Sequence, residues 1–342
     1  MIDDYFEALA IPPIAPKEYG TVYHYTSPDG LLGILDEEGI KLWFSKYDCL
    51  NDASEGQDIT EYYRSACKSL YENHEISDKL YQQIKGLEPD DTTLFGFPIP
   101  DGNDKKGPFA ILEKVKYDTY ICCFSANNNL LPMWNYYVKG NAYQGYNIGL
   151  KTEMFENTRR NRNIGFYERN GFLYLNIGKV IYDSDEKLNV LRQRILLFSD
   201  RFRQTSDPKN LKNNIISMLN TLRIIFKNQA FKHEEEIRAI LYRPIEIPPI
   251  VYNELLKSEF QKKGFPQNEL TTYKLPKIHY RTQAGIVVPY VIVQFYRYSD
   301  YLRSITIGPM ENSGAAIHSL NTLLDDRRHR AEIKLSEIPV RY

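Results

Sequence analysis

Cysteine is scarce in this sequence, and its arrangement does not match the usual cysteine-based sites. The 342 residues include four cysteines, Cys49, Cys67, Cys122 and Cys123, without a CxxC pair or a metal-ligand spacing to histidine. The adjacent pair Cys122-Cys123 lies in an apolar run, which favours core packing over redox chemistry. We therefore expect no metal centre, and we expect a reducing compartment, the cytoplasm.

Membrane spans, a secretory signal and an excess of basic residues are also missing. The longest apolar runs, such as residues 285–293, are far too short to span a bilayer. The first ten residues include Asp3, Asp4 and Glu7, where a signal peptide has a basic start and an apolar core. Lysine plus arginine number 43 against 44 for aspartate plus glutamate, which argues against a dedicated nucleic-acid binder but not against a nucleic-acid substrate. We expect no membrane partner.

The familiar glycine-rich phosphate-binding loops are absent, which disfavours a Rossmann or P-loop nucleotide site. The composition is nevertheless that of a folded protein, with 42% apolar and 25% charged residues. A chain of this length forms one large domain or two smaller ones. We interpret residues 1–342 as a single α+β domain.

The predicted elements begin with a strand, a helix and a second strand. Residues 21–26 favour a strand, Ser27 and Pro28 start a helix that ends near Gly39, and residues 40–45 are extended. Residues 183–230 predict two antiparallel helices with a break at 206–208, inserted in the sheet. The other predictions are loops at 48–55 and 86–108, a hairpin tip at 158–170, helices at 58–70, 131–139 and 311–326, and strands at 119–125, 145–150, 172–182, 234–242, 285–293, 302–307 and 331–335.

This order of elements predicts an α+β fold around a mixed, mainly antiparallel sheet. The loop at 86–108 is dense in glycine, proline and aspartate, and long loops of this kind are usually functional or mobile. It could close over a site.

Polar side chains occur at three places where the sequence otherwise favours strands. Glu234, Glu236 and Arg238 alternate, so a strand would put them on one face, with the two carboxylates roughly 7 Å apart. Such a pair raises the pKa of one carboxyl, while the arginine keeps the other ionised. This arrangement suits a reaction that develops positive charge on a sugar carbon. An exposed strand edge with a simple Glu–Arg ion pair is the alternative.

The other two places are the end of the first strand and the end of the strand at 119–125. Each of their side chains also has an ordinary structural interpretation: a histidine bonded to the backbone, a serine that ends a strand, and a tryptophan in the core. Their joint occurrence favours a site. These residues are His24, Tyr25 and Thr26 at the first place and Ser125 with Trp134 at the second.

Several short motifs follow one another in a characteristic order. They are His24-Tyr25-Thr26, Leu42-Trp43-Phe44-Ser45, Asn51-Asp52 with Glu55, Cys123-Phe124-Ser125, Met133-Trp134 with Tyr137, Gly145, Glu234 with Glu236 and Arg238, Ile307-Gly308-Pro309, and Ser336 with Ile338-Pro339. This order resembles the bacterial family catalogued as domain of unknown function 2971, from about residue 20 to the end. That family's pattern is in turn similar to the ADP-ribosyltransferase arrangement, a likeness at the level of the fold.

The resemblance implies an NAD-dependent ADP-ribosyltransferase-like fold and chemistry, with NAD as substrate and an unknown macromolecular acceptor. It implies that Glu236 stabilises the oxocarbenium as nicotinamide leaves, with Glu234 orienting the acceptor. It also implies that NAD is held by the remaining residues of the three places. In this view His24 bonds a ribose and assists catalysis, Tyr25 stacks on nicotinamide, Ser125 braces the glutamate, Arg238 meets a carboxylate or phosphate, and Thr26 and Trp134 complete the NAD site.

The leading hypothesis is therefore a transferase acting as a toxin or phage-defence effector. A non-catalytic nucleotide-sensing or protein-interaction module is the second. A hydrolase or nuclease with Glu234, Glu236, His24 and Asp52 around a metal is the third, although the spacing of these residues matches no known metal motif.

Overall fold

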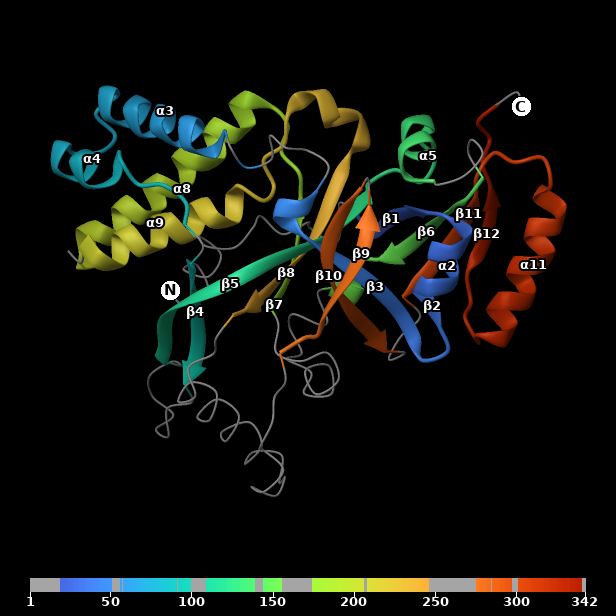
Figure 1. Cartoon of the computed structure of the whole chain (residues 1–342). Coiled ribbons are helices and arrows are strands. Elements are labelled where there is room, and N and C mark those ends of the chain that lie inside the picture. Colours follow the sequence, from blue (N-terminus) through green and yellow to red (C-terminus); the bar gives the residue numbers. More distant parts are fainter. Residues whose placement is uncertain are drawn as a thin grey trace, which may run out of the picture.

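The computed structural model describes residues 19–50, 56, 58–90, 92–99, 109–138, 144–155, 174–205, 208–245, 275–283, 285–296 and 301–339. At its centre lies a twisted, mainly antiparallel sheet (Figure 1). The strands are β1 (Thr21–Thr26), β2 (Leu35–Asp36), β3 (Gly39–Lys46), β4 (Thr92–Ile99), β5 (Phe109–Ser125), β6 (Tyr146–Lys151), β7 (Tyr174–Lys179), β8 (Glu236–Pro244), β9 (Ile278–Gln283), β10 (Ile286–Tyr296), β11 (Leu302–Ile307) and β12 (Glu332–Leu335).

The main path through the sheet runs β12-β11-β6-β1-β5-β3-β10-β9, and β8 pairs with β5 and β7 off this path. All ladders of the described residues are antiparallel except the parallel pair β11–β12. Together with the helices on its faces, this sheet confirms the predicted mixed α+β class.

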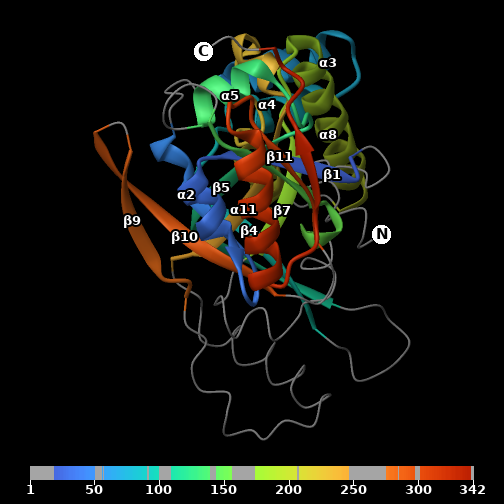
Figure 2. The same ribbon diagram turned by 90° about the vertical axis from the view of Figure 1, so that its right-hand side faces the viewer.

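Two groups of helices cover the sheet. The helices α3, α4, α8 and α9 gather beside β5 and β8 (Figure 1), and α2 and α11 lie on another side, toward the viewer in Figure 2. The bounds are α2 (Pro28–Ile34), α3 (Ile59–Glu72), α4 (Asp78–Ile84), α5 (Leu131–Tyr137), α8 (Ser184–Thr205), α9 (Pro208–Leu222) and α11 (Ser313–Asp326), with 3-10 turns η1 (Tyr47–Cys49) and η2 (Gln229–Glu234). No helix in this part of the chain is long and apolar enough to cross a membrane.

Strand β8 is buried on both faces, which is why its charged residues end up inside the protein. Ile237, Ala239 and Leu241 belong to the apolar cluster beneath α2 and α11. Ile240 and Tyr242 belong to the cluster formed with α3, α4, α8 and α9. Since side chains alternate along a strand, the even-numbered positions of β8 face α3, α4, α8 and α9.

The first helix begins where the sequence predicts. Ser27 accepts a hydrogen bond from the Gly30 amide, 3.1 Å away, and Pro28 fills the first turn without losing a needed donor. The predicted end near Gly39 is wrong, because α2 stops at Ile34. Residue Leu35 is already extended and pairs with Ile40, so pairing with β3 replaces a further helical turn.

Several other boundaries differ from the predictions. The loop predicted at 86–108 contains β4, which pairs with the first half of an unexpectedly long β5. Strand β9 and helix α4 were not predicted. The predicted helices at 131–139 and 183–230 end at Tyr137 and Leu222. Residues 51–55 of the predicted polar loop and the hairpin tip at 158–170 lie outside the described residues.

Candidate functional site

The candidate site is built where η2 leads into β8. Glu235 adopts a left-handed conformation, with φ 46°, between the last residue of η2, Glu234, and the first residue of β8, Glu236. The prediction that strand alternation aligns the two glutamates is therefore wrong. A left-handed residue turns the chain instead, and the two carboxylates meet on a common partner.

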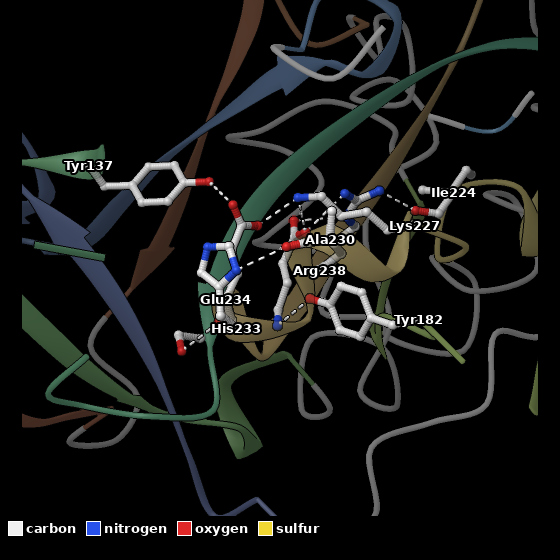
Figure 3. Close-up of polar contacts among 10 residues, drawn as sticks. Tyr137, Tyr182, Ile224, Lys227, Ala230, His233, Glu234 and Arg238 are labelled. Carbon is white, nitrogen blue, oxygen red and sulfur yellow. Dashed lines mark hydrogen bonds and ion pairs between the residues drawn. The ribbon is translucent and has the colours of Figure 1, made fainter. Parts of the chain in front are cut away.

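That partner is Lys227, which bridges the two glutamates (Figure 3). Its Nζ lies 2.6 Å from Glu234 Oε2 and 2.9 Å from Glu236 Oε2. Arg238 reaches Glu236 with two nitrogens, Nε at 2.8 Å from Oε1 and Nη2 at 3.0 Å from Oε2. Its Nη1 donates to the Ile224 carbonyl at 2.5 Å. The four charged side chains form one connected cluster of zero net charge.

The cluster is almost sealed from water. Glu234 is 5% exposed, Glu236 4% and Arg238 0%. The alternative of an exposed strand edge is thus wrong, while its Glu–Arg ion pair is present. Buried charges are tolerated only when each is paired and hydrogen-bonded, and this cluster meets that requirement.

The electrostatics hold Glu236 ionised. Burial alone would raise the pKa of its carboxyl, but the charges of Arg238 and Lys227 outweigh burial and lower the pKa to about 2. Burial would likewise lower the pKa of Lys227, yet the Glu236 charge prevails and raises it. The Cys123 thiol, beside Glu236, has a pKa well above its usual range because of burial and this negative charge. It is therefore not a thiolate nucleophile at neutral pH.

Ser125 braces the chain that carries the glutamates. It pairs with Glu236 in the β5–β8 ladder, and its Oγ donates to the Glu234 carbonyl at 2.9 Å. The next amide, of Ala126, donates to the Glu235 carbonyl at 2.8 Å. The Glu236 amide donates to the Tyr182 hydroxyl at 2.9 Å. The serine thus holds the backbone of the turn rather than a carboxylate.

Tyr137 connects the buried cluster with the surface. Its hydroxyl donates to Glu234 Oε1 at 3.1 Å, while 38% of the residue is exposed on α5 (Figure 3). Burial of the hydroxyl and the Glu234 charge raise the pKa of this tyrosine, so it remains a proton donor. Tyr137 is therefore the half-exposed side chain that contacts the buried Glu234.

His24 belongs to the neighbouring strand but to the opposite face of the sheet. Tyr23 pairs directly with Ser125, and Ser125 pairs with Glu236, so these three side chains share one face. Adjacent residues alternate, which puts His24 on the other face, 5.6 Å from the Phe124 ring. The structure brings the three strands together but separates the imidazole from the glutamates.

The His24 ring is bonded to the backbone. Its Nδ1 lies 2.9 Å from the Cys123 carbonyl oxygen. Burial lowers the pKa of His24, an effect the carbonyl bond opposes and the charge of Arg281 adds to. The ring is therefore neutral at pH 7, with the proton on Nδ1 as donor and Nε2 as acceptor.

The remaining predicted residues pack together beneath α5. The Tyr25 ring meets the Trp134 ring edge-on at 4.8 Å, and its hydroxyl accepts from the Leu130 amide at 2.8 Å. Burial raises the pKa of Tyr25 to about 12. Trp134 is fully buried and donates through Nε1 to Asn129 Oδ1 at 3.0 Å, and Thr26 is also buried. These contacts are those of a small core.

Sequence reasoning missed Lys227, Tyr182 and the role of Tyr137. A lysine that directly follows the apolar run 224–226, seven positions before a glutamate, is a signal for a buried cation. No group of three or more His, Cys, Asp or Glu side chains that could hold a metal occurs in the described ranges. Asp52, part of the metal hypothesis, lies outside them.

Residues 133–239 match a family model described as "Protein of unknown function (DUF2971)". The matched segment begins in α5 and ends in β8, so it contains Tyr137, Lys227 and the three charged residues of the predicted site. It therefore agrees with the family resemblance seen in the motifs, over a shorter span. Comparisons with curated proteins and with solved structures gave no match.

Proposed function

We propose that this protein is an ADP-ribosyltransferase-like enzyme that cleaves the nicotinamide–ribose bond of NAD. The observation that supports this most is the buried carboxylate of Glu236, held ionised by contacts of 2.8–3.0 Å with Lys227 and Arg238. A fixed anion beside a sugar carbon stabilises an oxocarbenium-like transition state. The bond to nicotinamide breaks with its electron pair on the leaving ring, and the acceptor adds to the sugar and loses a proton.

In this proposal Lys227 occupies the place that the developing positive charge takes during the reaction. Its ammonium already lies against both carboxylates. Substrate binding past Tyr137 displaces this ammonium, and Glu234 then orients the acceptor. Arg238 stays in place, because its three nitrogens are bonded to Glu236 and to the Ile224 carbonyl. It keeps Glu236 ionised instead of binding a phosphate.

The first strand has a lesser part in the proposal. His24 lies on the opposite face of the sheet from Glu236, so the proposal gives it no part in holding NAD or in the bond-breaking step. Tyr25, Thr26 and Trp134 support α5, and with it Tyr137, more directly than they could contact a ligand. A toxin or phage-defence role remains the biological setting we propose for the activity.

The test measures nicotinamide release and transfer of labelled ADP-ribose to protein, DNA and RNA acceptors. We expect both in the wild-type protein and in Glu235→Gln, which removes an exposed neighbouring carboxylate. We expect neither in Glu236→Gln or Glu234→Gln, assayed at a temperature where circular dichroism shows both folded. Folded wild-type protein that releases no nicotinamide with any acceptor contradicts the proposal.

A non-catalytic nucleotide-sensing module is the second candidate. It is favoured by one observation, that both oxygens of Glu236 are taken by cations while the side chain is 4% exposed. This candidate predicts that NAD raises the melting temperature by mass action while no nicotinamide appears. Thermal shift and product assays on the same sample separate the two candidates.

A further inference from the structure

A second polar feature lies on β9, away from the glutamates. The Arg281 guanidinium carbon lies 6.0 Å from the Trp43 ring centre and 5.9 Å from that of Tyr290. These two rings stack on each other at 4.6 Å, and the His279 ring lies 5.5 Å from Tyr290. The ladder β9-β10-β3 sets this arrangement, since Tyr290 pairs with both His279 and Ser45.

Arg281 has no acidic partner among the described residues. Its Nη2 donates to the Ser45 hydroxyl at 2.8 Å, and its Nε is buried without a partner. Burial lowers the pKa of the guanidinium, whose charge is thus partly stripped of water. The rings offset some of this cost. A buried donor left unpaired is itself costly, so an anion here would satisfy both the charge and the donor.

The sheet splits next to this feature. Strand β3 pairs with β5 only at Tyr120 and Ile121, and β1 pairs with it at Ser125. Between these points β5 is paired on its β8 side, and His24 bonds the Cys123 carbonyl. Arg281 bonds Ser45, whose ladder partner Ile121 is the last residue of β5 to pair with β3, so the guanidinium lies near this split.

We propose that Arg281 and Trp43 form a binding site for a nucleoside phosphate. The planar guanidinium fork matches a phosphate group, which it binds through paired N–H donors. Trp43 is 42% exposed, and an exposed indole beside a phosphate-binding arginine suits the flat face of a base. A simple inorganic anion would use the arginine and leave this ring without a role.

This inference shares only the ligand class with the proposed function, and its test needs no turnover. Tryptophan fluorescence reports it directly, because the sequence has two tryptophans and one of them, Trp134, is fully buried. The full chain is titrated with AMP, adenosine and inorganic phosphate. We expect a saturable change in emission with AMP, binding of adenosine at least ~10-fold weaker, and competition by inorganic phosphate against AMP.

Substitutions test which side chains contact AMP. Arg281→Lys keeps the charge but loses the fork, and we expect it to weaken AMP binding by ~10-fold. Arg303→Lys, at the exposed position of the otherwise buried strand β11, is the matched control and should bind AMP as the wild type does. Trp43→Phe should remove the fluorescence change without changing the circular dichroism. Glu236→Gln should bind AMP normally, which separates this site from the proposed catalytic one.

Four results would overturn the inference. Equal binding of AMP and adenosine would show that the site does not recognise the phosphate. Undiminished binding by folded Arg281→Lys would show that the guanidinium does not contact the ligand. If AMP gave no saturable fluorescence change with the wild-type protein, the binding site would not exist. Competition by acetate as strong as that by phosphate would assign the arginine to carboxylates instead.

Discussion

Replacing Glu236 by glutamine keeps the shape of the side chain and removes its negative charge. Its carboxyl pKa falls from 4.5 to about 2 in the folded protein. This difference of about 2.5 pH units corresponds to about 3 kcal/mol at 1.36 kcal/mol per unit. We expect the substitution to lower the free energy of unfolding by that amount, because Lys227 and Arg238 lose a shared partner. Breaking a buried ion pair typically costs ~3–5 kcal/mol, in agreement.

The lowered pKa also determines how the stability difference between wild type and Glu236→Gln changes with pH. The carboxyl is more acidic in the folded chain than in the unfolded one, so below about pH 4.5 the unfolded chain binds more protons. The stability difference between wild type and Glu236→Gln is therefore full above about pH 5. It shrinks as the pH falls toward 2, where the wild-type side chain also becomes neutral.

Urea unfolding followed by circular dichroism at a series of pH values measures this difference. For a chain of 342 residues, a loss of 3 kcal/mol lowers the melting temperature by about 4 °C. Glu235→Gln is the matched control and should change stability by less than ~0.5 kcal/mol, because this side chain is exposed. Equal stabilities of the two variants, or a difference that grows on acidification, would refute the reasoning.

Four further substitutions test other features. Lys227→Met leaves two buried carboxylates facing each other without their bridge and should cost ~3–5 kcal/mol in urea unfolding; a loss below ~1 kcal/mol speaks against the bridge. Gly145→Ala places a methyl group 2.6 Å from the Thr26 carbonyl oxygen and should lower the free energy of unfolding by ~1–3 kcal/mol. In Gly33→Ala the new methyl group meets no atom within 4 Å, so this control should raise the free energy of unfolding. Equal shifts of the melting temperature in the two variants would contradict this packing. Glu235→Asn relaxes a left-handed residue and should stabilise by ~0.5–1 kcal/mol; a lowered melting temperature disagrees.

Local chemistry made parts of the fold predictable. Ser27 and Pro28 mark the start of α2 because a cap and a fixed φ act within a few residues. The missed features depend on distant partners. Helix α2 stops early because Leu35 pairs with Ile40, and β4 forms because the far half of β5 lies beside it. Pairing of this kind leaves little trace in the pattern of a single segment.

In the candidate site, too, the residue types could be predicted from the sequence, whereas contacts that depend on distant segments could not. Glu234, Glu236 and Arg238 were identified because three charges in an otherwise apolar strand are conspicuous. The arrangement of these side chains was not predicted correctly, because the left-handed Glu235 breaks the strand alternation that the prediction assumed. Lys227 was missed because its contacts with both glutamates require the turn after α9. The face occupied by each side chain depends on the ladder register, which the sequence alone does not specify.

The pairing of β3 with β10 has a consequence for synthesis on the ribosome. Ser45 emerges early, yet its ladder partner Tyr290 is translated near the other end of the chain. At ~5–20 residues per second, the edge of β3 waits on the order of 10–50 s for its neighbour. During that interval an apolar strand with Leu42 and Phe44 has an open edge. Until β10 is made, this open edge is a place where the nascent chain can pair with other chains.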